Sequence, residues 1–166
     1  MAQRAGARPM HPSQLSAQLN PRHLAARLSY CRTLAQLSPC DRAQYGALLV
    51  DPRTNTILAE GWNGPPRGPA LSCGPDGCLR DQLAIPSGQR CEVGCHHAES
   101  NAIANAARRG AAVDGAWLIV SGAPCLQCAK LAHHAGVAVV WCELAGRDDA
   151  GLRYLSEHGV RVHCVA

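Results

Sequence analysis

The sequence lacks phenylalanine and contains only 3 tryptophans and 3 tyrosines among its 166 residues. Aromatic side chains on which single-stranded bases stack are therefore scarce, which disfavours a nucleic-acid partner. The sequence also has no run near the roughly 18 apolar residues of a membrane span. Its first residues contain no apolar stretch resembling a signal peptide. We therefore expect a soluble, cytoplasmic protein with no membrane partner.

Lysine occurs once, as Lys130, so almost all of the positive charge is carried by arginine. The formal net charge of +4 is spread along the chain and suits a small phosphate-bearing ligand as well as a polymer. A hydrophobic content of 47% and a charged content of 17% are typical of a globular domain. We expect residues 1–18, which are polar and contain Pro9 and Pro12, to form a loose leader, and residues 19–166 to form one domain.

Hydrophobic periodicity, turn residues and helix caps predict an alternation of helices and strands. The expected helices cover residues 20–38, 97–109, 124–136 and 148–158, and the expected strands cover residues 45–50, 56–62, 117–121, 137–141 and 160–164. The first two strands should pair as an antiparallel hairpin, whereas the helix between the last two should make those two parallel. The predicted fold is a three-layer α/β/α sandwich with a mixed five-stranded sheet.

Histidine, glutamate and two cysteines are placed at the starts of two expected helices. His97 and Glu99 open one helix, and Cys125 and Cys128 open another. Side chains three residues apart in the first turn share one side, so both thiolates can bind one ion near the positive helix end. Three protein ligands leave the fourth zinc position open for water, as in catalytic sites. Glu99 is close enough to bond that water as a proton carrier.

Each half of this pattern has a simpler explanation when taken alone. A single CxxC is common in structural zinc sites and redox pairs, and a single HxE often occurs by chance. In this order, with a helix and a strand between them, the two halves are typical of zinc deaminases. A zinc ion held there would lower the pKa of its water towards 7 for attack on C4 of a pyrimidine, and Glu99 would carry protons from that water to N3 and to the departing amine.

Four motifs together resemble the deoxycytidylate deaminase family over residues 22–145. They are HAESNAI at 97–103, PCLQCAK at 124–130, GWNGPPRG at 61–68 and CDRAQYGA at 40–47. Ser121 and Gly122 depart from the threonine-containing approach that is usual before the PC motif.

The resemblance implies a cytidine-deaminase-like fold and zinc-dependent deamination of deoxycytidine monophosphate (dCMP) to deoxyuridine monophosphate (dUMP) and ammonia. It implies that Ala98 contacts the base through its backbone and that Asn63 contacts the sugar, although Asn63 in a WNGP run is also a common turn residue. It further implies a homo-oligomer, and regulation by triphosphates such as dCTP and dTTP near Asn63 and Gly64.

Two further residues are weaker candidates for binding the nucleotide. Asn101 shares a helical face with Asn105, and such pairs are commonly just solvated. Arg67 could hold the phosphate, or it could be a solvated loop charge between prolines and glycines.

The stretch from residue 63 to residue 96 is long for an irregular connection and carries four cysteines. A second, structural zinc would explain how it stays ordered. The candidate ligands are Cys73, Cys78, Cys91 and Cys95, with His96 able to replace one of them. The alternative is that these are buried or free thiols beside a single catalytic zinc.

Several other functions remain open from the sequence. The domain could edit tRNA or single-stranded DNA, it could deaminate a free nucleoside or base, or it could be a non-catalytic zinc-binding module, for which Glu99 would be unnecessary. A dCMP deaminase is our first expectation.

Overall fold

A computed structural model describes residues 19–65, 73–74, 77–86, 89, 91, 93–143 and 149–165, with only the backbone described at Cys73 and Gly74. The expected leader, residues 1–18, lies outside this part. A five-stranded sheet with the order β2-β1-β5-β6-β7 forms the centre. Its strands are β1 (Gly46–Asp51), β2 (Thr56–Trp62), β5 (Trp117–Val120), β6 (Val139–Glu143) and β7 (Arg161–Val165).

Strand directions in this sheet are mixed. β1 is antiparallel to both β2 and β5, whereas β5, β6 and β7 run parallel. β5, β6 and β7 are parallel because the helix between each two of them returns the chain to the same end of the sheet. The predicted mixed sheet with parallel last strands is confirmed.

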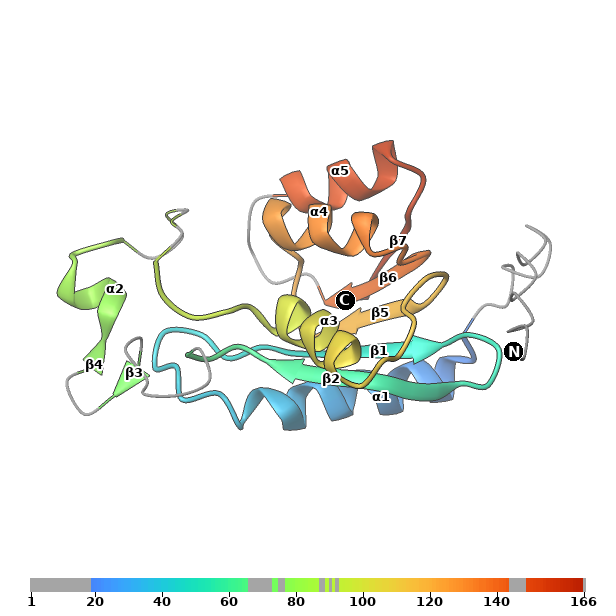
Figure 1. Ribbon diagram of the computed structural model, residues 1–166, viewed down its shortest axis with the longest axis horizontal. Coiled ribbons are helices and arrows are strands. Elements are labelled where there is room, and N and C mark those ends of the chain that lie inside the picture. Colours follow the sequence, from blue (N-terminus) through green and yellow to red (C-terminus); the bar gives the residue numbers. More distant parts are fainter. Residues whose placement is uncertain are drawn as a thin grey trace, which may run out of the picture.

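Four helices cover the two faces of the sheet (Figure 1). They are α1 (Pro21–Ala35), α3 (Ala98–Arg108), α4 (Leu126–His134) and α5 (Ala150–Glu157). α1 packs on one face, and the other three helices lie over the opposite face. The predicted three-layer α/β/α sandwich is therefore confirmed. None of the helices in the described part of the chain is long and apolar enough to cross a membrane.

The interior strand β1, between β2 and β5, is buried along its whole length. Its residues alternate between two hydrophobic clusters because successive side chains in a strand point to opposite faces. Leu48 and Val50 face α1, whereas Ala47 and Leu49 face α3 and α4. The sheet is thus a rigid support for the helices on both sides.

Helix α1 begins and ends through local hydrogen bonds. The side chain of Asn20 accepts from the backbone N–H of Arg22, and Pro21 occupies the first turn, as the sequence predicts. The regular helix ends at Ala35 rather than near Ser38. The next three backbone N–H groups bond to carbonyls three residues back, which tightens the last turn beyond α-helical geometry.

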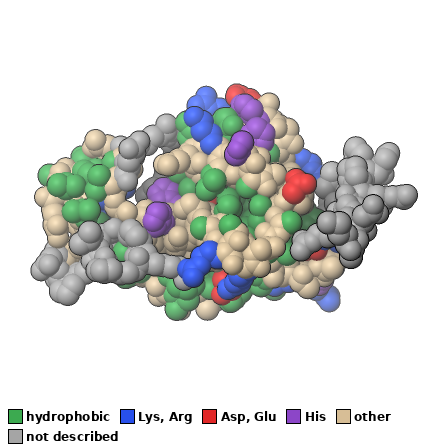
Figure 2. Space-filling model, in the orientation of Figure 1, with side chains coloured by type: hydrophobic (Ala, Val, Ile, Leu, Met, Phe, Trp, Pro, Cys, Tyr) green, Lys and Arg blue, Asp and Glu red, His purple; other side chains and the backbone are tan. Residues whose placement is uncertain are grey.

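Part of the cysteine-rich extension, defined as residues 73–96, has regular structure. It contains β3 (Cys73–Gly74), β4 (Gly77–Cys78) and α2 (Leu79–Gln82), where the sequence predicted only an irregular connection. Figure 1 shows these elements to one side of the sandwich. Hydrophobic side chains gather on this part of the surface (Figure 2), and Leu83 and Val93 are 53% and 41% exposed.

Candidate metal and active site

His97 and Cys125 each occupy the cap position immediately before a helix. Both have extended backbone dihedrals, so the first turn of α3 follows His97 and that of α4 follows Cys125. The backbone N–H of Cys128 lies 3.5 Å from the Cys125 sulfur. The positive ends of both helices therefore lie beside the site and favour negatively charged thiolates there.

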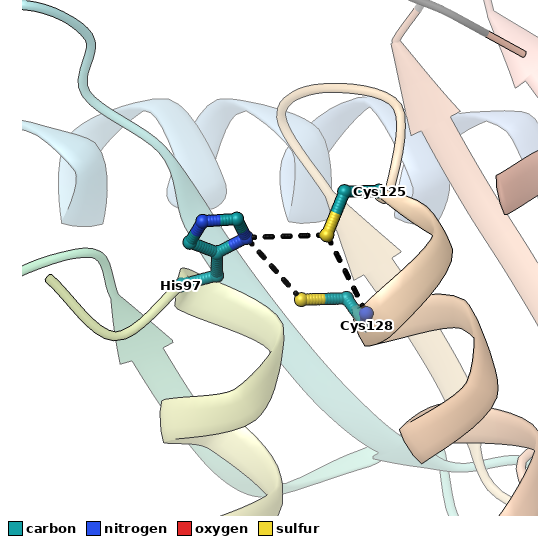
Figure 3. Close-up of side chains that lie close together, drawn as sticks. All are labelled: His97, Cys125 and Cys128. Carbon is teal, nitrogen blue, oxygen red and sulfur yellow. Dashed lines mark hydrogen bonds between the residues drawn. The ribbon is translucent and has the colours of Figure 1, made fainter. Parts of the chain in front are cut away.

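The three predicted zinc ligands meet at this point (Figure 3). Nδ1 of His97 lies 3.4 Å from the sulfur of Cys125 and 3.4 Å from that of Cys128. Among the described residues, this set is the group of three or more whose ligand atoms all lie within 4.8 Å of one another. Tetrahedral zinc with standard bond lengths separates its nitrogen and sulfur ligands by about 3.5 Å. The residues present therefore fit one zinc ion.

The two cysteines share one proton unequally: the hydrogen bond to Cys125 and burial raise the pKa of the Cys128 thiol, whereas that of Cys125 is lowered. Hydrogen bonding from the Cys128 side chain is the largest effect that lowers the pKa of the Cys125 thiol below its ordinary value, with further contributions from His97 and the Cys128 backbone. A thiol that loses its proton readily is a better metal ligand, because only the thiolate binds. Cys125 is half-buried and Cys128 is buried.

Glu99 is buried in the first turn of α3, with only 5% of its surface exposed. Burial raises the pKa of its carboxyl group, and a hydrogen bond from its own backbone and the charge of His97 partly oppose this shift. Its surroundings include both cysteines, since Cys125 and Cys128 also affect its ionisation. A buried carboxyl group with a raised pKa beside a metal site is suited to accepting a proton and donating it again.

Helix α3 is fixed against β2 at very short range. The side chains of Asn101 and Asn105 each donate to a backbone carbonyl of β2, those of Trp62 and Glu60, at 2.8 Å. Gly61 of β2 lies against the helix, where a β-carbon would overlap backbone atoms of Ala102, Ala98 and Asn101. The asparagine pair is therefore not simply solvated, because both amides help to hold the helix that carries His97 and Glu99.

Asn63 is buried and joins two loops. Its Nδ2 donates to the carbonyl of Ala43, and its Oδ1 accepts from the N–H of Tyr45 at 2.7 Å. The next residue, Gly64, exchanges two backbone hydrogen bonds with His96. Asn63 thus links the start of β1 to the segment that leads into His97. Ala98, the residue after His97, is fully buried.

The remaining predicted site residues fall in or next to the cysteine-rich extension. Arg67 and the side chain of Cys73 lie outside the described residues. Cys91 is half-buried, and its thiol donates to the carbonyl of Val93. Cys78 and Cys95 are also half-buried, and His96 is exposed. A second zinc in the extension therefore stays a prediction.

Arg42 makes a contact that the sequence analysis missed. Its guanidinium group donates to Asp81 at 2.7 Å and to the carbonyl of Ile85 at 3.1 Å. These residues, with Ala84 and Pro86, line a cavity of about 500 Å³ that does not include the three metal-site residues. The sequence feature that could have pointed to Arg42 is its place in the CDRAQYGA motif. Arg42 connects the sandwich to the extension.

An α/β/α sandwich with one histidine and two cysteines at two helix starts, beside a buried glutamate, defines a domain of the zinc-dependent deaminase type. The match to a family model is consistent with this class. The chain belongs to the cytidine and deoxycytidylate deaminase family, whose zinc-binding region matches residues 22–144.

Two curated proteins are similar to this chain in sequence. The chain is 36% identical over 130 residues to the deoxycytidylate deaminase of Schizosaccharomyces pombe, covering 77% of this chain and 39% of that protein. It is 36% identical over 110 residues to ComE operon protein 2 of Bacillus subtilis, covering 65% of this chain and 52% of that protein. The chain therefore spans about half or less of these curated relatives.

A solved structure is similar over its whole length. The dCMP deaminase of cyanophage S-TIM5, in complex with dCMP and dUMP, has 29% sequence identity and a TM-score of 0.74. The match covers 89% of this chain and 100% of that one. This likeness extends beyond the metal-site motifs to the arrangement of the domain.

Proposed function

We propose that this protein catalyses the zinc-dependent hydrolytic deamination of dCMP to dUMP and ammonia. The observation that carries the proposal is the convergence of His97, Cys125 and Cys128 beside buried Glu99. The substrate is taken from the family and from the cyanophage relative, whose complex contains dCMP and dUMP. The proposal thus rests on the site for the reaction and on the relatives for the nucleotide.

The chemistry of the site divides between the metal and the protein. A zinc ion held by His97, Cys125 and Cys128 supplies Lewis acidity, which makes hydroxide accessible at neutral pH. Glu99 would accept one proton from the attacking water and deliver it to N3, and would then carry the second proton, from the oxygen now on C4, to the amine that leaves. Its burial keeps bulk water away from this transfer and raises the pKa of its carboxyl group.

Four residues are proposed to contact the nucleotide. Ala98 offers backbone groups in the first turn of α3, and Asn63 and Asn101 lie on the two segments around that helix start. Both asparagines already bond backbone groups, so we assign them to shaping the pocket as well as to any direct contact. Arg67, in the segment outside the described residues, remains the proposed phosphate contact.

A substrate panel tests the function. Catalytic efficiency should be compared on dCMP, on deoxycytidine and on a cytosine-containing oligonucleotide at one salt concentration. We expect a clear preference for dCMP, since each charge-assisted hydrogen bond to the phosphate contributes about 1.5–3 kcal/mol. Adenine nucleotides should be inert. A preference for the nucleoside or the oligonucleotide would overturn the substrate assignment while leaving the zinc chemistry in place.

Further features are proposed from the sequence and the family resemblance. A second, structural zinc would be held by Cys73, Cys78, Cys91 and Cys95, with His96 as an alternative ligand, and would order the extension. We also propose a cytoplasmic homo-oligomer that dCTP and dTTP regulate. Size measurement in solution and assays with added triphosphates test the last two features.

A further inference from the structure

Tyr45 and Gly122 face each other at the end of the β1–β5 ladder. Ala47 pairs with Val120. One residue further on, the N–H of Ser121 donates to the carbonyl of Gly46, and the N–H of Gly46 donates to the Ser121 hydroxyl. The next pair along is therefore Tyr45 and Gly122. A β-carbon on Gly122 would lie only 2.6 Å and 2.8 Å from two carbons of the Tyr45 ring. The ring occupies the space that a side chain at position 122 would need.

Backbone conformation does not explain the glycine at position 122. The glycines with a positive φ are elsewhere, so Gly122 adopts dihedrals that other residues can also adopt. Gly122 is needed because the Tyr45 ring occupies the space of a β-carbon at position 122. The absent side chain and the large ring are thus a matched pair, and any larger residue at 122 must displace Tyr45.

The Tyr45 ring lies on the sheet face that carries the metal site. Residues two apart in a strand point to the same face, and Ala47 belongs to the cluster beneath α3 and α4. Tyr45 packs against the same cluster and is only half-buried. Part of its surface is therefore available on the face where α3 and α4 begin.

Both segments that carry the metal-site residues meet at Tyr45. Gly122 is three residues before Cys125 in the sequence. On the other side, the backbone N–H of Asn63 donates to the carbonyl of Tyr45, and the N–H of Tyr45 donates to Oδ1 of the Asn63 side chain. The neighbouring Gly64 bonds to His96, which precedes His97. The ring thus lies between the loop that leads to Cys125 and the loop that leads to His97.

We propose that Tyr45 is a specificity-determining residue whose ring forms a wall of the substrate pocket beside the metal and contacts the bound pyrimidine nucleotide. Gly122 provides the room that this position of the ring requires. The inference rests on the proposed function and adds a residue to it. An aromatic side chain in contact with a base contributes to binding by a factor of about 5 to 150.

The direct test is Tyr45→Val, with Tyr45→Phe as the matched control. Tyr45→Val removes the ring, so we expect KM for dCMP to rise at least about fivefold while kcat changes little, as for a contact made in both ground and transition states. The inhibition constant of the product dUMP should rise in parallel. Tyr45→Phe keeps the ring, and both constants should stay within about twofold of the parent. Bound zinc should be unchanged in both variants.

Gly122→Ala tests the position of the Tyr45 ring without changing Tyr45 itself. The added methyl group pushes the ring, so KM should rise although Tyr45 is intact. In the double variant with Tyr45→Val the methyl group has room, so its effect should largely disappear. If Tyr45→Val does not fold, an unchanged KM and dUMP inhibition constant in zinc-loaded Gly122→Ala would overturn the inference by themselves.

Two results would overturn the inference. One is an unchanged KM and dUMP inhibition constant in zinc-loaded Tyr45→Val. The other is additive effects of the two substitutions, because a matched pair must be coupled. If the parent protein deaminates a cytosine compound other than dCMP, the proposed function is wrong, and the same comparison on that compound still tests Tyr45.

Discussion

Two regions of the molecule present cysteines close in sequence, and they are held in very different ways. Cys125 and Cys128 stand at the start of α4, which packs on the central sheet, and they approach His97 at the start of α3. The cysteine-rich extension has two short strands and a four-residue helix, and Arg42 ties it to the sandwich. The core positions the first set of ligands, whereas in the described part of the extension Arg42 supplies the contact with the sandwich.

The largest effect is expected when a ligand of the core set is removed. Cys125→Ala should bind one zinc fewer than the parent and lose all detectable turnover, because two remaining ligands do not hold the ion. The fold should persist, since the sheet and its hydrophobic clusters do not depend on this side chain. Zinc analysis and a deamination assay measure both effects.

Cys164→Ala is the control for that variant. Cys164 is an exposed cysteine on the edge strand β7, away from the three metal-site residues. It should keep the zinc content and turnover of the parent. Parent-like zinc content in Cys125→Ala would refute the assigned ligand set.

A smaller effect on activity is expected from the extension. Cys91→Ala should also lose one zinc if the extension holds a structural ion, but most of the turnover should remain because His97, Cys125 and Cys128 are intact. Protease cleavage within residues 73–96 should become faster. A parent protein that is fully folded with a single zinc would rule out the second site.

The smallest effect is expected from the contact between the two regions. Arg42→Ala removes hydrogen bonds to Asp81 and to the carbonyl of Ile85, so hydrogen exchange in α2 should accelerate while exchange in β1 stays slow. Asp81→Asn keeps the Ile85 contact and should have a weaker effect, because Asp81 is 61% exposed in its side chain. Equal acceleration in β1 would show that the two regions open together.

Much of the fold was predictable because local signals agree with the tertiary structure. The cap formed by Asn20 and Pro21, the apolar strand 117–120 and the helix before the last strand all lie where the sequence placed them. Their boundaries moved by a few residues, because helix ends are set by final-turn hydrogen bonds that composition does not encode.

The site was predictable to the extent that ligand type and spacing specify it. His97, Glu99, Cys125 and Cys128 follow from matching their spacing to the zinc-deaminase signature, which metal chemistry and helix geometry support. The roles of Asn101 and Asn105 did not, since their partners are carbonyls of β2 about 40 residues away in sequence. The pairing of Tyr45 with Gly122 depends likewise on strand register, which only the assembled sheet provides.

The most direct test of the central claim is turnover of dCMP by zinc-loaded Glu99→Gln. The amide fills the same space but accepts no proton, so zinc content should equal that of the parent while kcat falls about 100- to 10,000-fold. Release of ammonia and formation of dUMP from dCMP measure the reaction, and metal analysis of the same sample measures the site. A variant with full zinc content and turnover within tenfold of the parent would contradict the assignment of Glu99 as the proton carrier.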